Sequence, residues 1–238
     1  MLIDTHCHIH DKEMFPLDAD EVLVRAKQAG VNRVIVIGTC PSDARHAQEF
    51  AAKRDGVFWA YGYHPEEKEE PLEFFRDEKL VSIGEIGLDY HYGRETRDAQ
   101  IKRFEIMLDL AQRENLPVNF HVREAFEDFW PIVDSFKLKS AVLHSFSDGQ
   151  ENLNQGIKRG MFIGVNGLAT FAKIPLPPLE SMIFETDAPF LTPVPFRGKI
   201  NEPGYVKNIA EWVAVAQKRD FDEVCKITTQ NAERLFNL

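Results

Sequence analysis

The stretch Leu2-Ile3-Asp4-Thr5-His6-Cys7-His8 holds the pattern around which the rest of the chain is organised. Leu2 and Ile3 predict a short buried strand that runs directly into two histidines. Side chains two apart in an extended segment point to the same side, so His6 and His8 project together from the strand end. Two imidazoles in this arrangement can bind one metal ion. An isolated pattern of this kind is common, and a core hydrogen bond or a solvated ring explains it equally well.

The 238 residues, 44% of them hydrophobic, suffice for one α/β barrel or one large two-layer domain with a proper core. No apolar run approaches the length that spans a bilayer, and the start lacks a basic region followed by an apolar stretch. The three cysteines, Cys7, Cys40 and Cys225, are far apart and odd in number, which is typical of reduced thiols. Cys7 is expected to face away from its neighbouring histidines and is not counted as a ligand. These features predict a soluble, cytoplasmic protein.

The formal net charge of −10 limits the classes of partner. Proteins that coat long nucleic acids neutralise phosphates with Lys and Arg, so that class is disfavoured. A small, locally positive pocket whose charge comes from bound metal remains compatible with the total. The acidic run at residues 66–70 is expected to be the solvated start of a helix.

Short apolar runs and helix-like segments alternate along the chain. Strands are predicted at residues 2–3, 33–37, 57–61, 81–84, 118–120, 141–143, 161–165 and 182–184. Helices are predicted at residues 18–30, 42–54, 71–77, 97–114, 125–136, 151–159, 203–218 and 222–236. We expect Asp18 or Asp20 to cap the first helix and Ser42 to cap the second.

Strands that alternate with helices imply right-handed crossovers and a parallel sheet. Eight such units in this length predict an α/β fold of the (β/α)8 TIM-barrel type, with residues 1–238 in a single domain. A doubly wound open sheet is the alternative, although no glycine-rich phosphate loop follows any strand. The connection at residues 166–181 contains Pro175, Pro177 and Pro178. Three prolines this close are incompatible with a helix interior, so we expect the helix between strands seven and eight to be missing or reduced.

Polar residues able to bind metal follow the predicted strands where each strand ends. In a barrel those ends form one face, where active sites lie. Each residue alone has a structural explanation, but together they predict a site. The residues are His6, His8, His64, Glu85, His121, His144 and Asp187.

Four of these five imidazoles, together with the two carboxylates, match a site for two hydrolytic cations. Imidazole suits Zn²⁺ and other first-row metals, whereas carboxylate also accepts Mg²⁺ or Mn²⁺. One carboxylate can bridge two ions about 3.5–4 Å apart, and such a pair activates water and stabilises charge on a phosphoryl or carbonyl oxygen. An aspartate near that water can take its proton.

The motifs that surround these residues resemble the TatD family in content and order, over nearly the whole chain. They are Asp4-Thr5-His6-Cys7-His8, Gly62-Tyr63-His64-Pro65, Gly84-Glu85-Ile86-Gly87-Leu88-Asp89-Tyr90, His144-Ser145-Phe146, Glu185-Thr186-Asp187-Ala188-Pro189, Arg197-Gly198-Lys199-x-Asn201-Glu202-Pro203 and Thr228-Thr229-x-Asn231-Ala232-x-Arg234-Leu235-Phe236. The resemblance implies a TIM barrel of the amidohydrolase superfamily. It also implies a divalent-metal-dependent DNase, since the family includes 3′→5′ exonucleases.

The resemblance implies two divalent ions, Mg²⁺, Mn²⁺ or Zn²⁺, and six ligands. The ligands are His6, His8, Glu85, His121, His144 and Asp187. The first ion would be held through the His-x-His pair, and the second by the histidines at positions 121 and 144. Glu85 would bridge the ions, and Asp187 would orient or deprotonate the attacking water.

The resemblance places His64 near the substrate phosphate, although a structural histidine is the alternative. Arg123 is a candidate phosphate ligand or a surface arginine at a helix start. Arg197 and Lys199 either add local positive charge or lie in a solvated loop. The remaining histidines are given no direct role: His10 is at most a neighbour of a ligand, and His46 and His91 are assigned to the surface.

The leading hypothesis is a metal-dependent hydrolase that cleaves phosphodiester bonds at DNA ends or in small substrates. Hydrolysis of a small ester, lactone or amide is the alternative, because the same metals polarise a carbonyl equally well. A non-catalytic metal-binding protein is a third hypothesis, which predicts a closed coordination shell. No membrane contact and no obligate protein partner are predicted.

Overall fold

Eight strands form a single sheet in which each strand pairs in parallel with the next one along the chain. The computed structural model describes residues 1–238. The strands are β1 Leu2–Cys7, β2 Val31–Gly38, β3 Val57–Tyr63, β4 Leu80–Asp89, β5 Val118–Arg123, β6 Ala141–Leu143, β7 Phe162–Val165 and β8 Met182–Phe184. Strands β1 and β4 are buried over their whole length, as expected when both faces of a parallel sheet are covered.

The sheet closes through the segment that follows β8. The backbone N–H of Asp187 donates to the carbonyl of His6, and that of His8 donates to the carbonyl of Ala188, both at 2.8 Å. We call these two hydrogen bonds the seam of the barrel. They join the first strand to the last, so the predicted TIM barrel is confirmed and the open doubly wound sheet is excluded.

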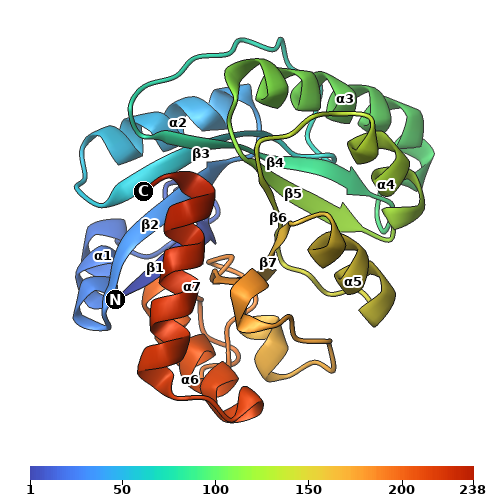
Figure 1. The fold of residues 1–238 in the computed structure, drawn as a ribbon. Helices are drawn as coiled ribbons and strands as arrows, with labels where there is room; N and C mark the ends of the chain where they lie inside the picture. The colour runs from blue at the N-terminus through green and yellow to red at the C-terminus, as the bar shows by residue number, and fades with distance from the viewer.

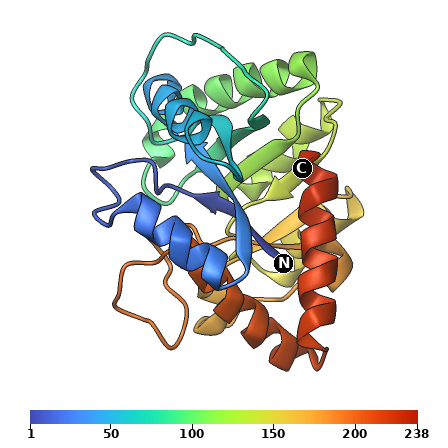
Figure 2. The same cartoon turned by 90° about the vertical axis from the view of Figure 1, so that its left-hand side faces the viewer.

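Seven helices surround the barrel on its outside (Figure 1). They are α1 Ala19–Gln28, α2 Pro41–Ala52, α3 Arg97–Glu114, α4 Phe126–Asp134, α5 Gln150–Lys158, α6 Val206–Gln217 and α7 Phe221–Phe236. Short 3-10 helices are η1 Arg94–Thr96, η2 Gly167–Thr170, η3 Leu179–Ser181 and η4 Pro203–Tyr205. The two chain ends lie on the same side of the molecule in both views (Figures 1 and 2), and Thr229 of α7 donates to the Met1 carbonyl at 2.6 Å. None of the helices combines the length and apolar character that crossing a bilayer requires.

Local sequence explains where the first two helices begin. Asp18 caps α1, because its carboxylate accepts hydrogen bonds from the backbone N–H groups of Asp20 and Glu21. The prediction that Ser42 caps α2 is wrong. The helix begins at Pro41 with Cys40 as the cap position, because the fixed φ of proline suits the first helical position. The Ser42 hydroxyl instead donates to Glu70 at 2.9 Å.

The predicted helix at residues 71–77, and its predicted acidic start, are wrong, since no helix lies between β3 and β4. Side chains of β3 donate hydrogen bonds to backbone carbonyls of this segment, which in a helix would accept from backbone N–H groups. The Tyr61 hydroxyl donates to the Glu73 carbonyl at 2.9 Å, and the Tyr63 hydroxyl to the Lys68 carbonyl at 3.0 Å. The connection therefore follows the barrel wall as an irregular chain.

The connection between β7 and β8 holds only the short helices η2 and η3, which confirms the prediction from its prolines. Side chains of α6 and α7 bond its carbonyls in place of a helix. Gln217 donates to the Pro177 carbonyl at 2.8 Å, and Asn231 donates to the carbonyls of Leu179 and Met182 at 2.7 and 2.8 Å.

Candidate metal centre

The carboxyl ends of the strands open into a pocket of about 580 Å³. This volume lies within the range of about 300–1,000 Å³ that is usual for small-molecule sites. Seven of the predicted site residues line it: His8, His64, Glu85, His121, Arg123, His144 and Asp187. The eighth, His6, is fully buried beside the lining residues. The structure thus brings all eight predicted residues to one place.

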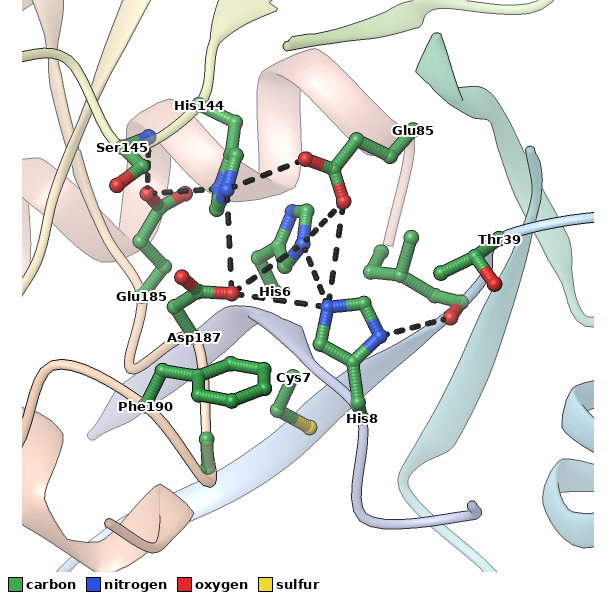
Figure 3. A network of polar contacts seen from close by, with 12 residues as sticks. His6, Cys7, His8, Thr39, Glu85, His144, Ser145, Glu185, Asp187 and Phe190 are labelled. Atoms are coloured by element: carbon green, nitrogen blue, oxygen red, sulfur yellow. Dashed lines mark hydrogen bonds and ion pairs between the residues drawn. The ribbon is translucent and has the colours of Figure 1, made fainter. Parts of the chain in front are cut away.

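His6 and His8 converge from the end of β1, as their spacing predicts. Their Nε2 atoms are 3.3 Å apart and lie 3.8 and 3.6 Å from Oδ1 of Asp187 (Figure 3). Nδ1 of His8 lies 3.1 Å from the carbonyl oxygen of Ile37 and donates to it. Because that bond places the proton on Nδ1, Nε2 keeps a lone pair that faces the pocket.

Glu85 lies at the centre of the cluster and is 4% exposed. Its Oε2 is 3.2 Å from Nε2 of His6, whereas its Oε1 is 2.7 Å from Nδ1 of His121 and 3.5 Å from Nε2 of His144. The two carboxylate oxygens therefore face different groups of imidazoles. Such a placement suits a carboxylate that contacts two cations.

Three groups of ligand atoms lie close enough to hold a cation, each with its atoms within 4.8 Å of one another. The groups are His6, Glu85 and His144; His6, His8 and Asp187; and His64, Glu85 and His121. Imidazole nitrogens and carboxylate oxygens are ligands that divalent first-row cations accept, so the residues fit a metal centre. The sequence did not place His64 in such a group, and the individual ligand assignments remain predictions.

Three residues that the sequence analysis missed lie against the outward nitrogens of the imidazoles. Oε1 of Glu185 lies 3.0 Å from Nδ1 of His144, and Oδ2 of Asp89 lies 2.8 Å from Nε2 of His121. The Asn119 amide contacts Nδ1 of His6 at 3.1 Å. Polar side chains that contact the second ring nitrogen fix the tautomer and the orientation of metal-binding histidines. Their signal was the position of Asp89 and Glu185 at strand ends, and of Asn119 two residues before His121.

Glu185 has room because β7 carries a glycine opposite it. A Cβ at Gly164 would lie 2.4 Å from Oε2 of Glu185, so only glycine allows the carboxylate to enter this space. Oε1 of Glu185 also accepts a hydrogen bond from the backbone N–H of Ser145 at 2.6 Å. The carboxylate is thereby fixed against His144.

The carboxylates of the cluster favour positive charge at the neighbouring imidazoles. Burial opposes charge on His144, but Glu185, Glu85 and Asp187 outweigh it and raise the pKa of His144 to about 10. Burial likewise opposes charge on His121, but hydrogen bonds to Asp89 and Glu85 raise its pKa to about 9. A field that stabilises imidazolium also stabilises a bound cation, for which the proton is a competitor.

His64 is electrostatically different from these two histidines. Burial and the neighbouring His121 lower the pKa of His64 to about 3, so the ring is neutral at pH 7. The backbone N–H of Glu66 donates to its Nδ1 at 3.2 Å. The proton of the neutral ring is therefore on Nε2, which lies 3.8 Å from Oε1 of Glu85.

The predicted basic residues lie in two places. Arg123 is the last residue of β5 rather than the start of a helix, and it lines the pocket. Arg197 and Lys199 are not among the lining residues. Arg197 lies over the ring of Phe171 at 3.8 Å and donates to the Thr192 carbonyl, so it supports the loop after β8.

The remaining histidines lie as the sequence predicts. His10 is buried beside the cluster with Nε2 3.1 Å from Asp43, and His46 and His91 are exposed. The prediction that residues 66–70 form a solvated helix start is wrong, because Glu66 and Glu67 line the pocket. The irregular β3–β4 connection brings them there.

The family model for TatD-related DNases matches residues 3–237. The chain belongs to this family. The match agrees with the barrel and with the strand-end cluster, since both extend over the matched residues.

Relatives with similar sequences are metal-dependent hydrolases and exonucleases by name. The chain is 36% identical to the uncharacterized metal-dependent hydrolase YabD of Bacillus subtilis, with both chains covered in full. It is 33% identical to the 3′-5′ ssDNA/RNA exonuclease TatD of Erwinia tasmaniensis, over 94% of this chain and 95% of that protein. Among solved structures, the TatD homologue YjjV of Escherichia coli K12 matches with a TM-score of 0.88 and 29% identity, over 100% of this chain and 98% of that one.

Proposed function

We propose that the protein is a metal-dependent deoxyribonuclease that hydrolyses phosphodiester bonds at the ends of DNA. The observation that carries this proposal is Glu85, whose two oxygens face separate groups of imidazoles at the carboxyl end of the barrel. Exonuclease names among the relatives support nucleic acid as the substrate. We further propose that residues 1–238 act as a single domain, since every residue of the cluster lies in a strand of the one sheet or within three residues of a strand end.

The residues would hold two divalent cations, with Mg²⁺, Mn²⁺ and Zn²⁺ as candidates. The ligands we propose are His6, His8, Glu85, His121, His144 and Asp187. Bound cations supply charge stabilisation for the phosphoryl oxygens and make water more acidic.

Asp187 is the group we propose to take the proton of the attacking water. Burial opposes its ionisation, but His144 and His8 outweigh burial and keep the pKa of Asp187 below its usual value, so it is a carboxylate at pH 7. His64 carries a proton on Nε2 that it can donate to a phosphate oxygen. Arg123, at the pocket wall, supplies a permanent cation for the same phosphate.

Hydrolysis of a small ester, lactone or amide is the second candidate. Glu66 and Glu67 on the pocket wall favour it, because their charges repel the phosphates of a long polyanion. The same acidic wall and the net charge of −10 lead us to restrict the first proposal to DNA ends and short substrates.

The test is hydrolysis of a 5′-labelled single-stranded DNA oligonucleotide with added Mg²⁺ or Mn²⁺. We expect a ladder that shortens from the 3′ end, and no product after treatment with a chelator. The Asp187→Asn variant should lose at least about 100-fold in rate, as expected when a general base is removed.

Each alternative gives a different outcome. An intact oligonucleotide from protein that binds metal would overturn the nuclease proposal and lead to assays with esters, lactones and amides. Metal binding without hydrolysis of any of these would favour a non-catalytic metal protein. Unchanged cleavage by Asp187→Asn would indicate a contaminating nuclease.

A further inference from the structure

An exposed phenylalanine lies at the mouth of the pocket. Phe190 follows Asp187 by three residues, lines the pocket and is 50% exposed. Figure 3 shows its ring next to the Asp187 carboxylate, on the side of the cluster that holds His8. Three aromatic side chains of this protein are exposed, namely Tyr92, Phe171 and Phe190, and of these only Phe190 lines the pocket, so its uncovered ring is the one placed to contact a ligand there.

The backbone that carries this ring is fixed on both sides. The N–H of Phe190 donates to the Asp187 carbonyl at 2.8 Å, and the side chain of Asn201 donates to the Phe190 carbonyl at 2.5 Å. The N–H of Asn201, a fully buried residue, donates to the Pro189 carbonyl at 3.1 Å. These three hydrogen bonds fix the backbone at Phe190 and so hold its ring at the mouth of the pocket.

The pocket wall holds both apolar side chains and a cation. Leu168 and Leu191 line it together with Phe190. Arg123 also lines it, and its guanidinium lies 4.9 Å from the ring of Tyr92, which is 66% exposed. A planar apolar face, a metal centre and a cation match the base, the scissile phosphate and the adjacent phosphate of one strand of nucleic acid.

We infer that Phe190 is a stacking platform for a nucleobase of one of the two nucleotides joined by the scissile phosphodiester. This inference rests on the proposed nuclease function and adds a residue that binds the substrate beside the metal centre. A base inside a duplex has its faces covered by neighbouring base pairs, so it must leave the stack before it meets the ring. Aromatic stacking accepts every base, because each has a π face, and it gives affinity without sequence preference.

The test combines changes to the ring with removal of the base. Wild-type protein and the variants Phe190→Ala, Phe190→Leu and Phe190→Trp are assayed on a single-stranded oligonucleotide. Matched oligonucleotides carry an abasic tetrahydrofuran residue on one side or the other of the terminal phosphodiester. Phe171→Ala is the control, since Phe171 is 41% exposed but does not line the pocket. Metal content and melting temperature are recorded for each protein.

We expect Phe190→Ala and Phe190→Leu to raise KM roughly 5- to 150-fold, the effect of losing one stacked base. Phe190→Trp and Phe171→Ala should keep the wild-type KM. One abasic oligonucleotide should be a comparably poor substrate for the wild type, and Phe190→Ala should not distinguish it from the normal oligonucleotide.

Several results would overturn the stacking platform while leaving the nuclease in place. They are a wild-type KM in Phe190→Ala, full activity in Phe190→Leu, and equal cleavage of abasic and normal ends by the wild type. Full activity in Phe190→Leu would show that the position needs only an apolar side chain. Absence of cleavage of every oligonucleotide by the metal-loaded wild type would overturn the nuclease function, and the platform with it.

Discussion

At the scale of single residues, the orientation of His144 depends on Glu185. The Glu185 side chain is fully buried, and its Oε1 is 3.0 Å from Nδ1 of His144. Nε2 of His144 lies on the other side of the ring, 3.5 Å from Oε1 of Glu85 and 3.9 Å from Oδ1 of Asp187, where a cation can replace its proton. Glu185 is thus a positioning residue that makes the imidazole a stronger ligand.

Glu185→Gln should weaken metal binding without unfolding the protein, because the amide keeps the shape and one acceptor but loses the charge. We expect metal affinity to fall about 10- to 100-fold, as for other partners of metal-binding histidines. The pKa of His144 should also fall in metal-free protein, since Glu185 is the strongest of the groups that raise it. Calorimetric metal titration and NMR titration of the histidines measure the two effects.

The control for this variant is Glu180→Gln, which removes the same charge at an exposed position in η3. A lower metal affinity in both variants would mean that overall charge, rather than contact with His144, is responsible. An unchanged pKa of His144 in Glu185→Gln would contradict the assigned contact.

The sequence predicted which ligand residues lie on one face of the barrel, but not which side chains contact one another there. His144 and Glu185 each follow a strand directly, and that position alone brings both to one face of a barrel, although only His144 was predicted as a site residue. Their contact across the face depends on the glycine at position 164, since any Cβ there would enter the space of the carboxylate. A requirement of that kind arises from packing between strands, so it leaves no periodic signal in the sequence.

At the scale of elements, the β3–β4 connection relies on one arginine of α3 in place of a helix of its own. Nη1 of Arg103 donates to the carbonyls of His64, Pro65 and Glu67 at 3.0, 3.3 and 2.8 Å. Its guanidinium also lies 4.2 Å from the centre of the Tyr63 ring. The arginine therefore bonds carbonyls that lack helical partners and holds His64 against the cluster.

Arg103→Met should loosen this connection, because the side chain keeps its apolar contact with Tyr63 but loses every donor. We expect the free energy of unfolding to fall by about 1–3 kcal/mol, because the partly buried carbonyls of Pro65 and Glu67 lose their donor, whereas that of His64 keeps the backbone N–H of Glu67. On an oligonucleotide substrate KM should rise, while the metal stoichiometry stays constant. Chemical denaturation and steady-state kinetics measure these quantities.

Arg113→Met is the matched control on the same helix, since Arg113 is exposed and bonds only Asp109. Equal destabilisation by the two substitutions would indicate a general effect on α3. Loss of metal from Arg103→Met would show that the connection supports the ligands as well as His64.

The two helix-free connections differ in how far the sequence predicts them. Prolines at positions 175, 177 and 178 exclude a helix locally, whatever the surroundings, and that prediction holds. Residues 71–77 contain no such signal after Pro71, and their charged and apolar residues suit a helix. The hydroxyl groups of Tyr61 and Tyr63, on the adjacent strand, instead bond carbonyls of this connection. Contacts between elements of this kind cannot be predicted from the local sequence.

At the scale of the whole molecule, a metal centre that exists only in the folded chain links metal binding to stability. At a free metal concentration 100 times the dissociation constant, one bound ion should stabilise the fold by about 2.7 kcal/mol. For a domain of this size that corresponds to a melting temperature about 5–10 °C higher. Calorimetry with and without a chelator measures the difference.

The stabilisation by metal should decrease as pH falls from 8 to 6. His121 and His144 have raised pKa values in metal-free protein, so they hold protons that a metal ion must displace. More protons at lower pH strengthen that competition, which weakens metal binding. A melting temperature that is independent of chelator at every pH would contradict a metal centre at these residues.

The seam determines when the metal centre can form during synthesis on the ribosome. His6 and His8 leave the ribosome early, whereas Asp187 and Ala188, their partners across the seam, are synthesised only after all eight strands are complete. Until Asp187 has been added, the nascent polypeptide carries five of the six proposed ligands and lacks the complete centre. The centre is therefore complete only after the last strand has emerged and the seam has closed the barrel.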